Sequence, residues 1–432
     1  MRKIFFLMLA FVINTCVYSQ WSQQSNPTAE ELYTIHFVNH STAYIAGSNG
    51  TILKSTNAGE NWESQVSNTS LPLMGVGFIN LNTGYLIGGN IQQAGYPGII
   101  IKTTNGGLNW IAKHSANGTA FRQGLHFINP NTGFAAGWSN NTVPVYKTTN
   151  AGENWTPVTI NNIYGIDNFC FVDENIGWAV GWGLTPPMLY VLKTTDGGEN
   201  WNINNTFTQY GEFFSICFVN SNTGWIAGHN HNPWRSLILK TTNGGFEWFE
   251  QFHNHSMTTV ILYNMYFANE NTGRMVGDAG IIIKTTNAGE NWGAQQNPYL
   301  GNGGLWSVHF FGIDTGWTVS ETGRVLHTVN GGGPVAVKSV SSIMPDGYKL
   351  EQNYPNPFNP FTNIKFSIPE NVLVTLKIFD LLGKEIAVLL NEKLSSGTYE
   401  ITFDGSDLTS GVYLYQLAAG SYKETNRMIL IK

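Results

Sequence analysis

Four histidines in two identical motifs are the residues of this 432-residue chain with the plainest metal-binding chemistry. Each motif reads His-Asn-His, which places His229 and His231 in one predicted loop and His253 and His255 in the next. Alternate imidazoles on two neighbouring loops could supply nitrogen ligands for zinc or copper. Loops rich in Asn and His are also ordinary polar surface. We therefore keep these four histidines as candidates and predict no bound metal or other cofactor.

Asp167 and Glu212 are the acidic pair best placed for hydrolysis, because they fall in neighbouring copies of a sequence repeat. A glycoside hydrolase needs two carboxyl groups at a defined separation, one acting as acid and the other as base or nucleophile. The sequence does not give this separation. Catalysis by this pair is therefore an alternative function, and we make no prediction that the chain is an enzyme.

The repeat is marked by a nine-residue motif that occurs six times, as in "KTTNGGLNW" at 102–110 and "KTTNAGENW" at 147–155. Its final tryptophans are 44 to 48 residues apart, a period typical of propeller blades or solenoids. In such a turn the Asn or Asp bonds its own backbone downstream, the Gly takes a positive φ and the Trp packs between units. The motif is therefore predicted to be structural. The tryptophans are Trp62, Trp110, Trp155, Trp201, Trp248 and Trp292.

The rest of each unit predicts four short strands. An apolar stretch ending in Phe is followed by a turn such as "NPNTG", an aromatic-Gly segment such as "GWAVG" (177–181), a variable loop and a β-rich run. There is no helical periodicity, so each unit reads as a propeller blade. A seventh unit at 305–334 has a degenerate motif and lacks the last strand. Residues 20–27 resemble the outer strand at 291–298, so we predict that the N-terminus closes a seven-bladed β-propeller.

The motif resembles the Asp-box of bacterial neuraminidase (BNR) repeats, and the whole unit resembles the photosystem II assembly-factor family of propellers, over residues 20–333. In the neuraminidase family the box is structural and lies away from the catalytic face. The resemblance implies a fold, because such repeats serve binding proteins and hydrolases alike. A sialidase needs an arginine triad, and no Arg-Ile-Pro motif is present. Xyloglucanase-like hydrolases share the repeat but form their cleft between two propellers. The arginines of the predicted propeller are Arg122, Arg235, Arg274 and Arg324.

The tail changes character after residue 333. Residues 334–347 are predicted to be a linker, and alternating strands and turns over 348–432 predict a small Ig-like β-sandwich. "NYPNPFNP" (353–360), "SSGTYEITFDGSDLTSGVYLYQL" (395–417) and the terminal "MILIK" resemble the type A C-terminal sorting domain of the type IX secretion system. The resemblance implies that this secretion machinery is a partner, that the tail is usually cut off, and that the cargo is released or attached to surface lipopolysaccharide. An ordinary Ig-like accessory module is the alternative.

The N-terminus predicts export. Arg2 and Lys3 precede an apolar run, and small residues before a cut after Ser19 fit a signal peptide at 1–19. Acylation of Cys16, as in a lipoprotein, is the alternative. No later segment predicts a membrane span, and a net charge of −6 with few arginines argues against nucleic acid. We expect a protein that is secreted or displayed on the outer cell surface after periplasmic transit.

Specificity is expected on the face that holds the connections between second and third strands, because these vary between units. They have 10 to 14 residues in units two to five and seven residues in the others. Each longer connection carries one aromatic ring, and such a crescent could stack on sugars or grip a partner, or could cap its own blades. We predict a binding propeller for a glycan or protein ligand; the alternative is a glycoside hydrolase or sialidase-like enzyme on the same face. The four rings are Tyr96, Trp138, Trp182 and Trp234.

Two cysteines remain after the predicted cleavage, and both stand immediately before the Phe of their unit. Cys170 and Cys217 occupy equivalent positions in neighbouring blades, and equivalent positions point the same way around a ring. A disulfide needs facing Cβ vectors, so we expect two free cysteines that do not face each other. His36, His126 and His309 share the same slot. These histidines could form a ring of metal ligands or could simply pack between the inner strands, and we predict that they pack.

Overall fold

The protein is all-β, as the strand pattern predicts. The computed structural model describes residues 21–432 apart from 91, 94, 140–143, 185–186, 209–210, 232–233, 252–259, 291, 296, 298, 330, 333–337, 342–343, 395 and 406–407. Within these residues it contains strands β1 to β36 and two 3-10 helices, η1 (Ser48–Gly50) and η2 (Asp278–Gly280). Neither these nor any other helix of the described residues has the length and apolar character that crossing a bilayer requires. The predicted signal peptide, residues 1–19, lies outside the described residues.

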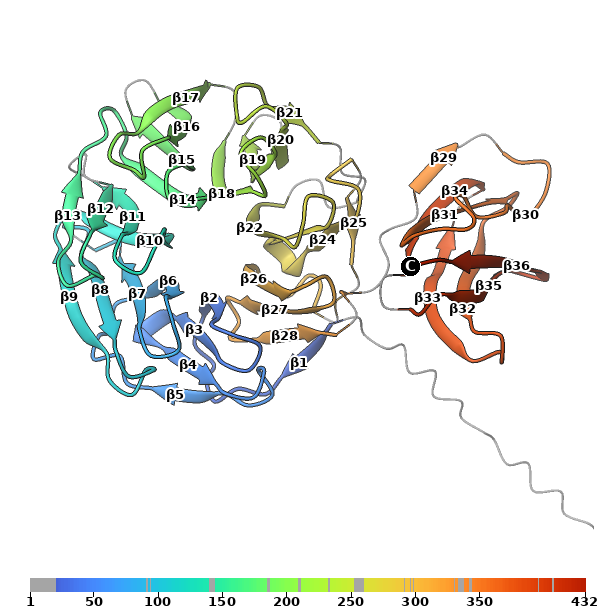
Figure 1. Cartoon of the computed structure of the whole chain (residues 1–432), viewed down its shortest axis with the longest axis horizontal. Coiled ribbons are helices and arrows are strands. Elements are labelled where there is room, and N and C mark those ends of the chain that lie inside the picture. The colour runs from blue at the N-terminus through green and yellow to red at the C-terminus, as the bar shows by residue number, and fades with distance from the viewer. Residues whose placement is uncertain are drawn as a thin grey trace, which may run out of the picture.

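Strands β1 to β28 form seven sets of four around a common centre, which we number as blades 1 to 7 (Figure 1). Blade 1 holds β2 (Leu32–Phe37), β3 (Ala43–Gly47), β4 (Ile52–Ser55) and β5 (Glu63–Gln65). Blade 2 holds β6 (Leu73–Phe78), β7 (Gly84–Gly89), β8 (Gly98–Thr103) and β9 (Ile111–Ala116). Blade 3 holds β10 (Thr119–Phe127), β11 (Gly133–Ser139), β12 (Val145–Thr148) and β13 (Thr156–Val158). Blade 4 holds β14 (Gly165–Phe171), β15 (Gly177–Leu184), β16 (Pro187–Thr194) and β17 (Asn202–Phe207).

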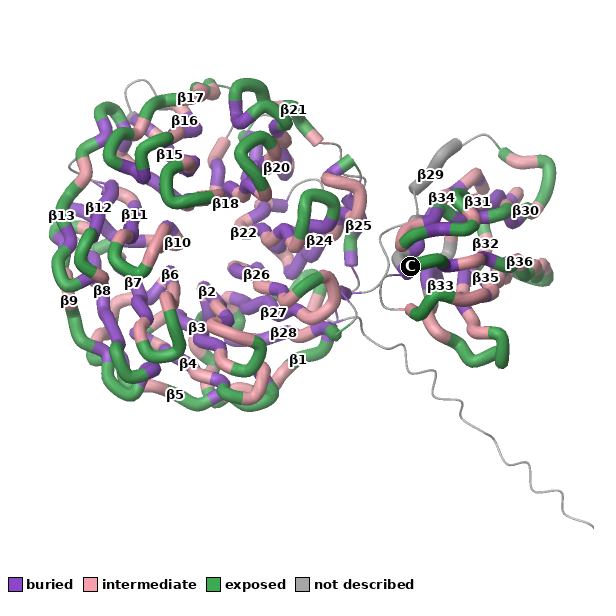
Figure 2. The backbone as a smooth tube through the Cα atoms, in the orientation of Figure 1, coloured by how far each residue is buried: buried purple, intermediate pink, exposed green. Residues whose placement is uncertain are grey.

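The remaining three blades continue in chain order. Blade 5 holds β18 (Glu212–Phe218), β19 (Gly224–His231), β20 (Trp234–Thr241) and β21 (Phe249–Glu250). Blade 6 holds β22 (Leu262–Phe267), β23 (Gly273–Gly277), β24 (Ile282–Thr285) and β25 (Gly293–Ala294). Blade 7 holds β26 (Leu305–Phe311), β27 (Thr315–Ser320), β28 (Val325–Thr328) and β1 (Ser22–Gln24). Buried residues follow the second strands, while exposed residues gather on the outermost strands and the turns (Figure 2).

The ring closes by joining the two ends of the propeller, as the match between residues 20–27 and 291–298 predicts. β1 pairs antiparallel with β28, with Ser22 opposite His327 and Gln24 opposite Val325. The preceding residue, Trp21, is fully buried, and its ring meets that of Phe310 edge to face at 5.7 Å. Blade 7 therefore takes its outer strand from the opposite end of the chain, which leaves no unpaired seam.

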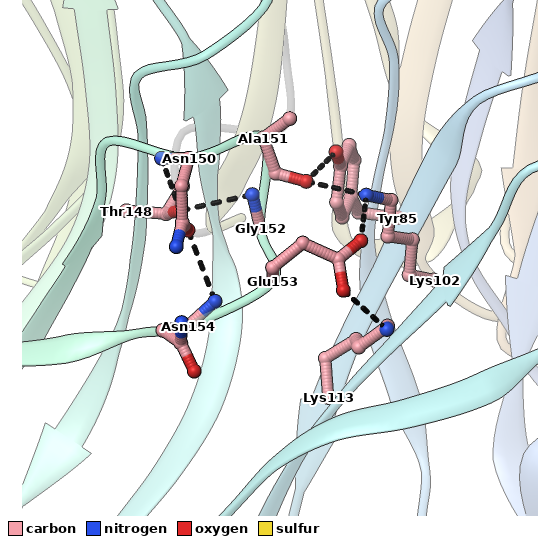
Figure 3. Close-up of polar contacts among 9 residues, drawn as sticks. All are labelled: Tyr85, Lys102, Lys113, Thr148, Asn150, Ala151, Gly152, Glu153 and Asn154. Carbon is pink, nitrogen blue, oxygen red and sulfur yellow. Dashed lines mark hydrogen bonds and ion pairs between the residues drawn. The ribbon is translucent and has the colours of Figure 1, made fainter.

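The Asp-box is a hydrogen-bonded turn whose donors and acceptors satisfy one another (Figure 3). In blade 3 the Thr148 hydroxyl accepts from the backbone N–H of Gly152 at 2.9 Å, and the Asn150 side-chain oxygen accepts from the backbone N–H of Asn154 at 3.0 Å. Ala151 and Gly152 both have positive φ, 54° and 70°. The predicted roles of the Asn and the Gly are confirmed, and the residue before the Gly shares the left-handed conformation.

The box of blade 3 is also held by blade 2, so this box connects the two blades. The Ala151 carbonyl accepts from the Tyr85 hydroxyl and from the Lys102 ammonium of blade 2, both at 2.6 Å. Glu153 pairs with Lys102 and with Lys113, again at 2.6 Å (Figure 3). These contacts lower the pKa of Glu153 to about 2. The same pair of hydrogen bonds recurs in other blades. The carbonyl of Gly106 accepts from Tyr44 and Lys54, and the carbonyl of Gly244 accepts from Trp178 and Lys193.

The two cysteines are free, but the expectation that they do not meet is wrong. Cys170 Sγ accepts a hydrogen bond from the backbone N–H of Phe218 at 2.9 Å, and the Cys170 and Cys217 thiols are close enough to interact electrostatically. The contact arises because Cys170 leans across the boundary between blades 4 and 5 onto the innermost strand of the next blade. The interaction with Cys170, together with burial, raises the pKa of Cys217 well above its ordinary value.

The histidines of the same slot are packing residues, as predicted. His36 and His309 meet at 5.8 Å between ring centroids, and His126 stacks on Phe171 at 5.1 Å. Burial lowers the pKa of His36 and of His126 to about 4 and that of His309 to about 3, so all three rings are neutral at neutral pH.

The tail is a sandwich of two four-stranded sheets. One sheet has the order β29-β34-β31-β30 and the other β33-β32-β35-β36. The sandwich has a hydrophobic core separate from those of the propeller, and this core includes Ile364, Leu376 and Tyr415. β29 lies inside the stretch predicted to be a linker and pairs with β34, Lys338 opposite Glu400, so the sandwich begins before residue 348. The strands are β29 (Lys338–Ser341), β30 (Lys349–Leu350), β31 (Phe361–Ile368), β32 (Val372–Phe379), β33 (Glu385–Leu394), β34 (Gly397–Asp404), β35 (Gly411–Ala419) and β36 (Tyr422–Leu430).

Candidate functional site

A pocket of about 420 Å³ opens between blades 3, 4 and 5. Its walls come from the ends of β11, β15, β17 and β19 and from the starts of β16 and β18, which all lie at the edge of the ring opposite the Asp-boxes. This is the face where the sequence predicts specificity. The main lining residues are Trp138, Trp182, Met188, Phe207, Glu212 and His231.

Trp138 and Trp182 form the aromatic wall of this pocket. Their rings meet edge to face, 5.5 Å apart and at 84°. Both are half-buried and stand on strands β11 and β15, so they are not the exposed loop residues that the sequence suggests. The longer connections of blades 4 and 5 continue the hairpin ladders: Trp182 pairs with Leu189, and His231 with Trp234.

Backbone pairing between blades brings the two tryptophans together. Trp138 of β11 pairs with Gly165 of β14, which joins blades 3 and 4 into one eight-stranded sheet. Gly165 is needed for this approach, because a Cβ there would lie 2.1 Å from Nε1 of Trp182. A side chain at residue 165 would therefore displace the ring that forms the pocket wall.

Asp167 is the buried support of Trp138. Its Oδ1 accepts a hydrogen bond from Trp138 Nε1 at 2.8 Å and lies 3.8 Å from Nε of Arg122. The Arg122 guanidinium in turn lies 4.4 Å from the centroid of the Trp138 ring. Burial raises the pKa of Asp167 to about 7 even though Arg122 and the indole N–H both lower it, and the charge of Glu212 raises it further. Asp167 is only 6% exposed, so it positions Trp138 and does not line the pocket.

Glu212 is the carboxylate that does line the pocket. It begins β18, opposite His229 in the ladder with β19. Burial raises its pKa, and the nearby charges of His231 and Arg122 oppose this. No hydrogen-bond donor to its carboxylate is found among the described residues. The sequence correctly puts Asp167 and Glu212 on the same face, but the structure gives them different surroundings.

His229, His231 and Trp234 form a cluster at the rim. His229 Nε2 lies 3.3 Å from His231 Nδ1, and the Trp234 ring lies 4.5 Å from that of His229. Burial lowers the pKa of His229 to about 4. Within the described part of the chain, no group of three or more His, Cys, Asp or Glu side chains could hold a metal ion. The other two candidates, His253 and His255, lie outside the described residues.

The predicted crescent is only partly assembled. Trp138 and Trp182 share the pocket, and Trp234 reaches it through His231, at 5.4 Å between ring centroids. Tyr96 lies in the turn of blade 2 with a φ of 47° and does not line the pocket. Ligand binding by these four rings stays a prediction.

A further set of site residues comes from β-bulges, which the sequence analysis does not identify. The register of the innermost strand shifts at one place in all seven blades, and a bulge re-aims the side chain that it carries. Bulged side chains of neighbouring blades contact one another: Tyr263 stacks on Trp306 at 4.2 Å, and Phe214 meets Tyr263 at 5.4 Å. Only about 10 Å³ remains between them, roughly the space of one water molecule. The shifts fall at Tyr33, Met74, Arg122–Gly124, Asp167, Phe214, Tyr263 and Trp306.

A weak signal of the bulges is present in the sequence. When the innermost strands are aligned, as in "LMGVGF", "LWSVHF" and "IDNFCF", the second residue varies in size and polarity while the first and last stay apolar. A variable position inside an otherwise repeated strand is compatible with a side chain that leaves the core.

Family models match most of the chain. Residues 13–169 and 158–295 match the family described as photosynthesis system II assembly factor YCF48, and residues 352–432 match the secretion system C-terminal sorting domain. The chain belongs to the YCF48 family of propellers. The sorting domain further shows that this YCF48-family propeller is exported by the type IX system toward the cell surface or the extracellular space.

Solved structures agree with this fold. A YCF48 bound to D1 peptide is 19% identical, with a TM-score of 0.55, and covers 72% of this chain and 98% of its own. YCF48 from Cyanidioschyzon merolae is 16% identical, with a TM-score of 0.54, and covers 71% and 98%. The GH74 enzyme of Niastella koreensis is 13% identical, with a TM-score of 0.53, and covers 94% and 74%. At such identities the likeness shows the fold alone. No curated protein matches the chain.

Proposed function

We propose that this chain is an exported binding protein that holds a glycan or protein ligand in the pocket of Trp138 and Trp182. One observation carries the proposal: two indole rings at 84° wall a cavity of about 420 Å³ on the face where the blades differ. Ligand sites are commonly concave, mostly apolar and furnished with a few polar groups, and this pocket adds Glu212 and His231 to its apolar walls.

The surroundings of the two carboxylates favour binding over hydrolysis. Glycosidases place both carboxyl groups beside the scissile bond, roughly 5 to 9.5 Å apart. Here Glu212 faces the pocket, while Asp167 lies beneath Trp138 and is engaged by the indole N–H. A sugar in the pocket would meet only one of them. Glycoside hydrolysis remains the alternative, and a reducing-sugar assay tests it directly.

The solved YCF48 complex contains a peptide, so a related propeller is able to hold a polypeptide segment. This observation supports a protein ligand for the present chain, while the aromatic wall supports a glycan equally well. The same experiment therefore tests a glycan ligand and a protein ligand side by side.

The test is to block the pocket without disturbing the core. Thr208 is exposed and lines the pocket, so Thr208→Trp should fill the entrance. Ser64 is exposed on β5 of blade 1, and Ser64→Trp is the matched control. Glycan arrays and displayed peptide libraries should give ligands that bind the full chain and the control but not Thr208→Trp. Ligands that bind all three equally would place the site elsewhere, and release of reducing sugar would establish the hydrolase.

We also propose that the sandwich acts as an export address that is separate from the binding unit. The proposed division is a signal peptide at 1–19, the propeller at 20–333 and the sorting domain at 348–432, preceded by β29. Deleting residues 338–432 removes the whole sandwich and should leave a folded propeller in the periplasm, because the two parts have separate cores. Normal export of the truncated protein would contradict this role.

A further inference from the structure

The charges around the pocket are unbalanced. Among the described residues that line it, Glu212 is the one carboxylate, His231 the one other titratable side chain, and no Lys or Arg is present. The nearest arginine, Arg122, lies outside the lining and has Asp167 as its counter-ion at 3.8 Å. Glu212 therefore has no ion pair and no hydrogen bond with a described residue, and only the more distant charges of His231 and Arg122 act on it.

Glu212 is placed where an unpaired carboxylate is unfavourable. It is half-buried beside Trp182, Phe207 and Leu189, and no described residue donates a hydrogen bond to it. Removing a carboxylate from water without a compensating partner costs free energy, and a cation of the right shape would recover it. The raised pKa of Glu212 has the same physical cause.

The aromatic walls favour the same kind of ligand. A cation is attracted to the face of an aromatic ring, most strongly to indole. The chain already uses this contact elsewhere, with Lys193 at 5.0 Å from the Trp178 ring and Arg274 at 3.9 Å from the Phe310 ring. Met188, Leu189 and Phe207 would meanwhile cover an aliphatic stem, as apolar surfaces do for buried lysine side chains.

We propose that the pocket receives a lysine side chain of a polypeptide, with Glu212 as counter-ion to the ammonium and with Trp138 and Trp182 as the walls around it. The inference rests on the proposed binding function and makes its ligand specific. A polypeptide is the favoured source because the cavity, at about 420 Å³, is roughly large enough for a side chain together with flanking backbone.

The test compares a lysine with its neutral counterpart. A fluorescent Gly-Gly-Lys-Gly-Gly peptide and the same peptide with Nε-acetyl-lysine are titrated against the full chain, and the lysine peptide should bind about tenfold more tightly. Glu212→Gln should abolish this preference, and Glu212→Asp, which keeps the charge, should retain part of it. Glu63, exposed on the outer strand β5, gives the control Glu63→Gln, which should behave as the wild type. Thermal midpoints verify that each variant is folded.

Each result has one reading. Equal binding of the two peptides, no binding of either, or a preference that survives Glu212→Gln would overturn the lysine assignment. If a glycan or another peptide still binds in a way that Thr208→Trp blocks, the proposed binding function stands without it. If no ligand is sensitive to Thr208→Trp, both proposals fail.

Discussion

The two faces of the propeller differ in how fully their polar groups are hydrogen-bonded. On the Asp-box face, the same turn recurs from blade to blade, its side-chain oxygens satisfy local backbone N–H groups, and a neighbouring blade holds its carbonyl (Figure 3). On the opposite face the blades differ, the buried carboxyl of Asp167 has a raised pKa, and Glu212 has no hydrogen-bond donor among the described residues. The polar groups of the Asp-box face are satisfied within the protein, whereas the opposite face keeps polar groups that a ligand could satisfy.

The comparison teaches where stability and specificity are separated in this fold. Burying a charge without full compensation costs free energy. Such charges are kept mainly where they serve a function, so side chains with perturbed pKa values are concentrated at functional sites. Changes on the repeated face and in the closing strand should therefore lower stability, while changes on the variable face should alter ligand binding or the pH dependence of stability. The four predictions below test that separation, from the largest expected effect to the smallest.

The largest effect is expected at the closure of the ring. Trp21→Ala should lower the free energy of unfolding by about 3–5 kcal/mol, because a fully buried indole is lost and a cavity is left between blades 6 and 7. Deleting residues 21–26, which removes β1 as well, should cost more. Urea denaturation measures both, with Ser22→Ala, an exposed position on the same strand, as control. An unchanged midpoint for the deletion would mean that β1 does not close the ring.

A smaller loss is expected in a single box. Thr148→Val should cost about 1–3 kcal/mol, because the buried N–H of Gly152 loses its acceptor. Thr148→Ser should restore most of the stability, since Ser55 accepts the equivalent bond from Gly59 at 2.9 Å in blade 1. Denaturation midpoints of both variants are the measurement. An unchanged midpoint for Thr148→Val, which keeps the methyl group and lacks the oxygen, would show that the hydrogen bond from Gly152 does not stabilise the box.

On the variable face the expected effect depends on pH. The pKa of Asp167 is raised from 3.8 to about 7, so the folded state holds this proton more tightly than the unfolded chain. The stability that the group contributes is present below the unfolded pKa and is lost as pH rises through the folded pKa. Asp167→Asn keeps an acceptor for Trp138 Nε1 but removes the titration, so the variant should gain stability relative to the wild type as pH rises.

Thermal midpoints between about pH 5 and about pH 8.5 measure this difference. Arg122 and Glu212 are present in both proteins, so the difference between the two curves reports on Asp167. Parallel curves for the two proteins would mean that Asp167 has an ordinary pKa and that the buried support of Trp138 is described wrongly.

The smallest effect is expected at Tyr96. Tyr96→Ala should change stability by no more than about 0.5 kcal/mol, because the side chain is half-exposed in a turn of blade 2. Ligand affinity should also stay within about twofold, since Tyr96 does not line the pocket. Isothermal titration with any ligand of the Trp182 pocket measures this. A loss comparable with that of Thr208→Trp would extend the site across blade 2.

The repeated parts of the molecule could be predicted because their causes are local in sequence. The Thr148 to Asn154 turn is fixed by hydrogen bonds that span at most four residues, so the same letters give the same turn in each blade. The match between residues 20–27 and 291–298 likewise predicts that β1 completes blade 7, because equivalent strands carry equivalent patterns. The sorting motifs of the tail identify its class for the same reason.

The site could be predicted only as a face and a set of residue types. Trp138 and Trp182 come together because β11 pairs with β14 between blades, Asp167 turns toward Trp138 because a bulge re-aims it, and Cys170 meets Cys217 across the same kind of boundary. Repeat spacing says nothing of how two blades twist against each other, so it cannot say which residues of neighbouring blades touch. The sequence by itself therefore determined the blade, its box and the way the ring closes. Only the tertiary structure decided which carboxylate is buried and which faces the pocket, since burial depends on side chains that lie far away along the chain.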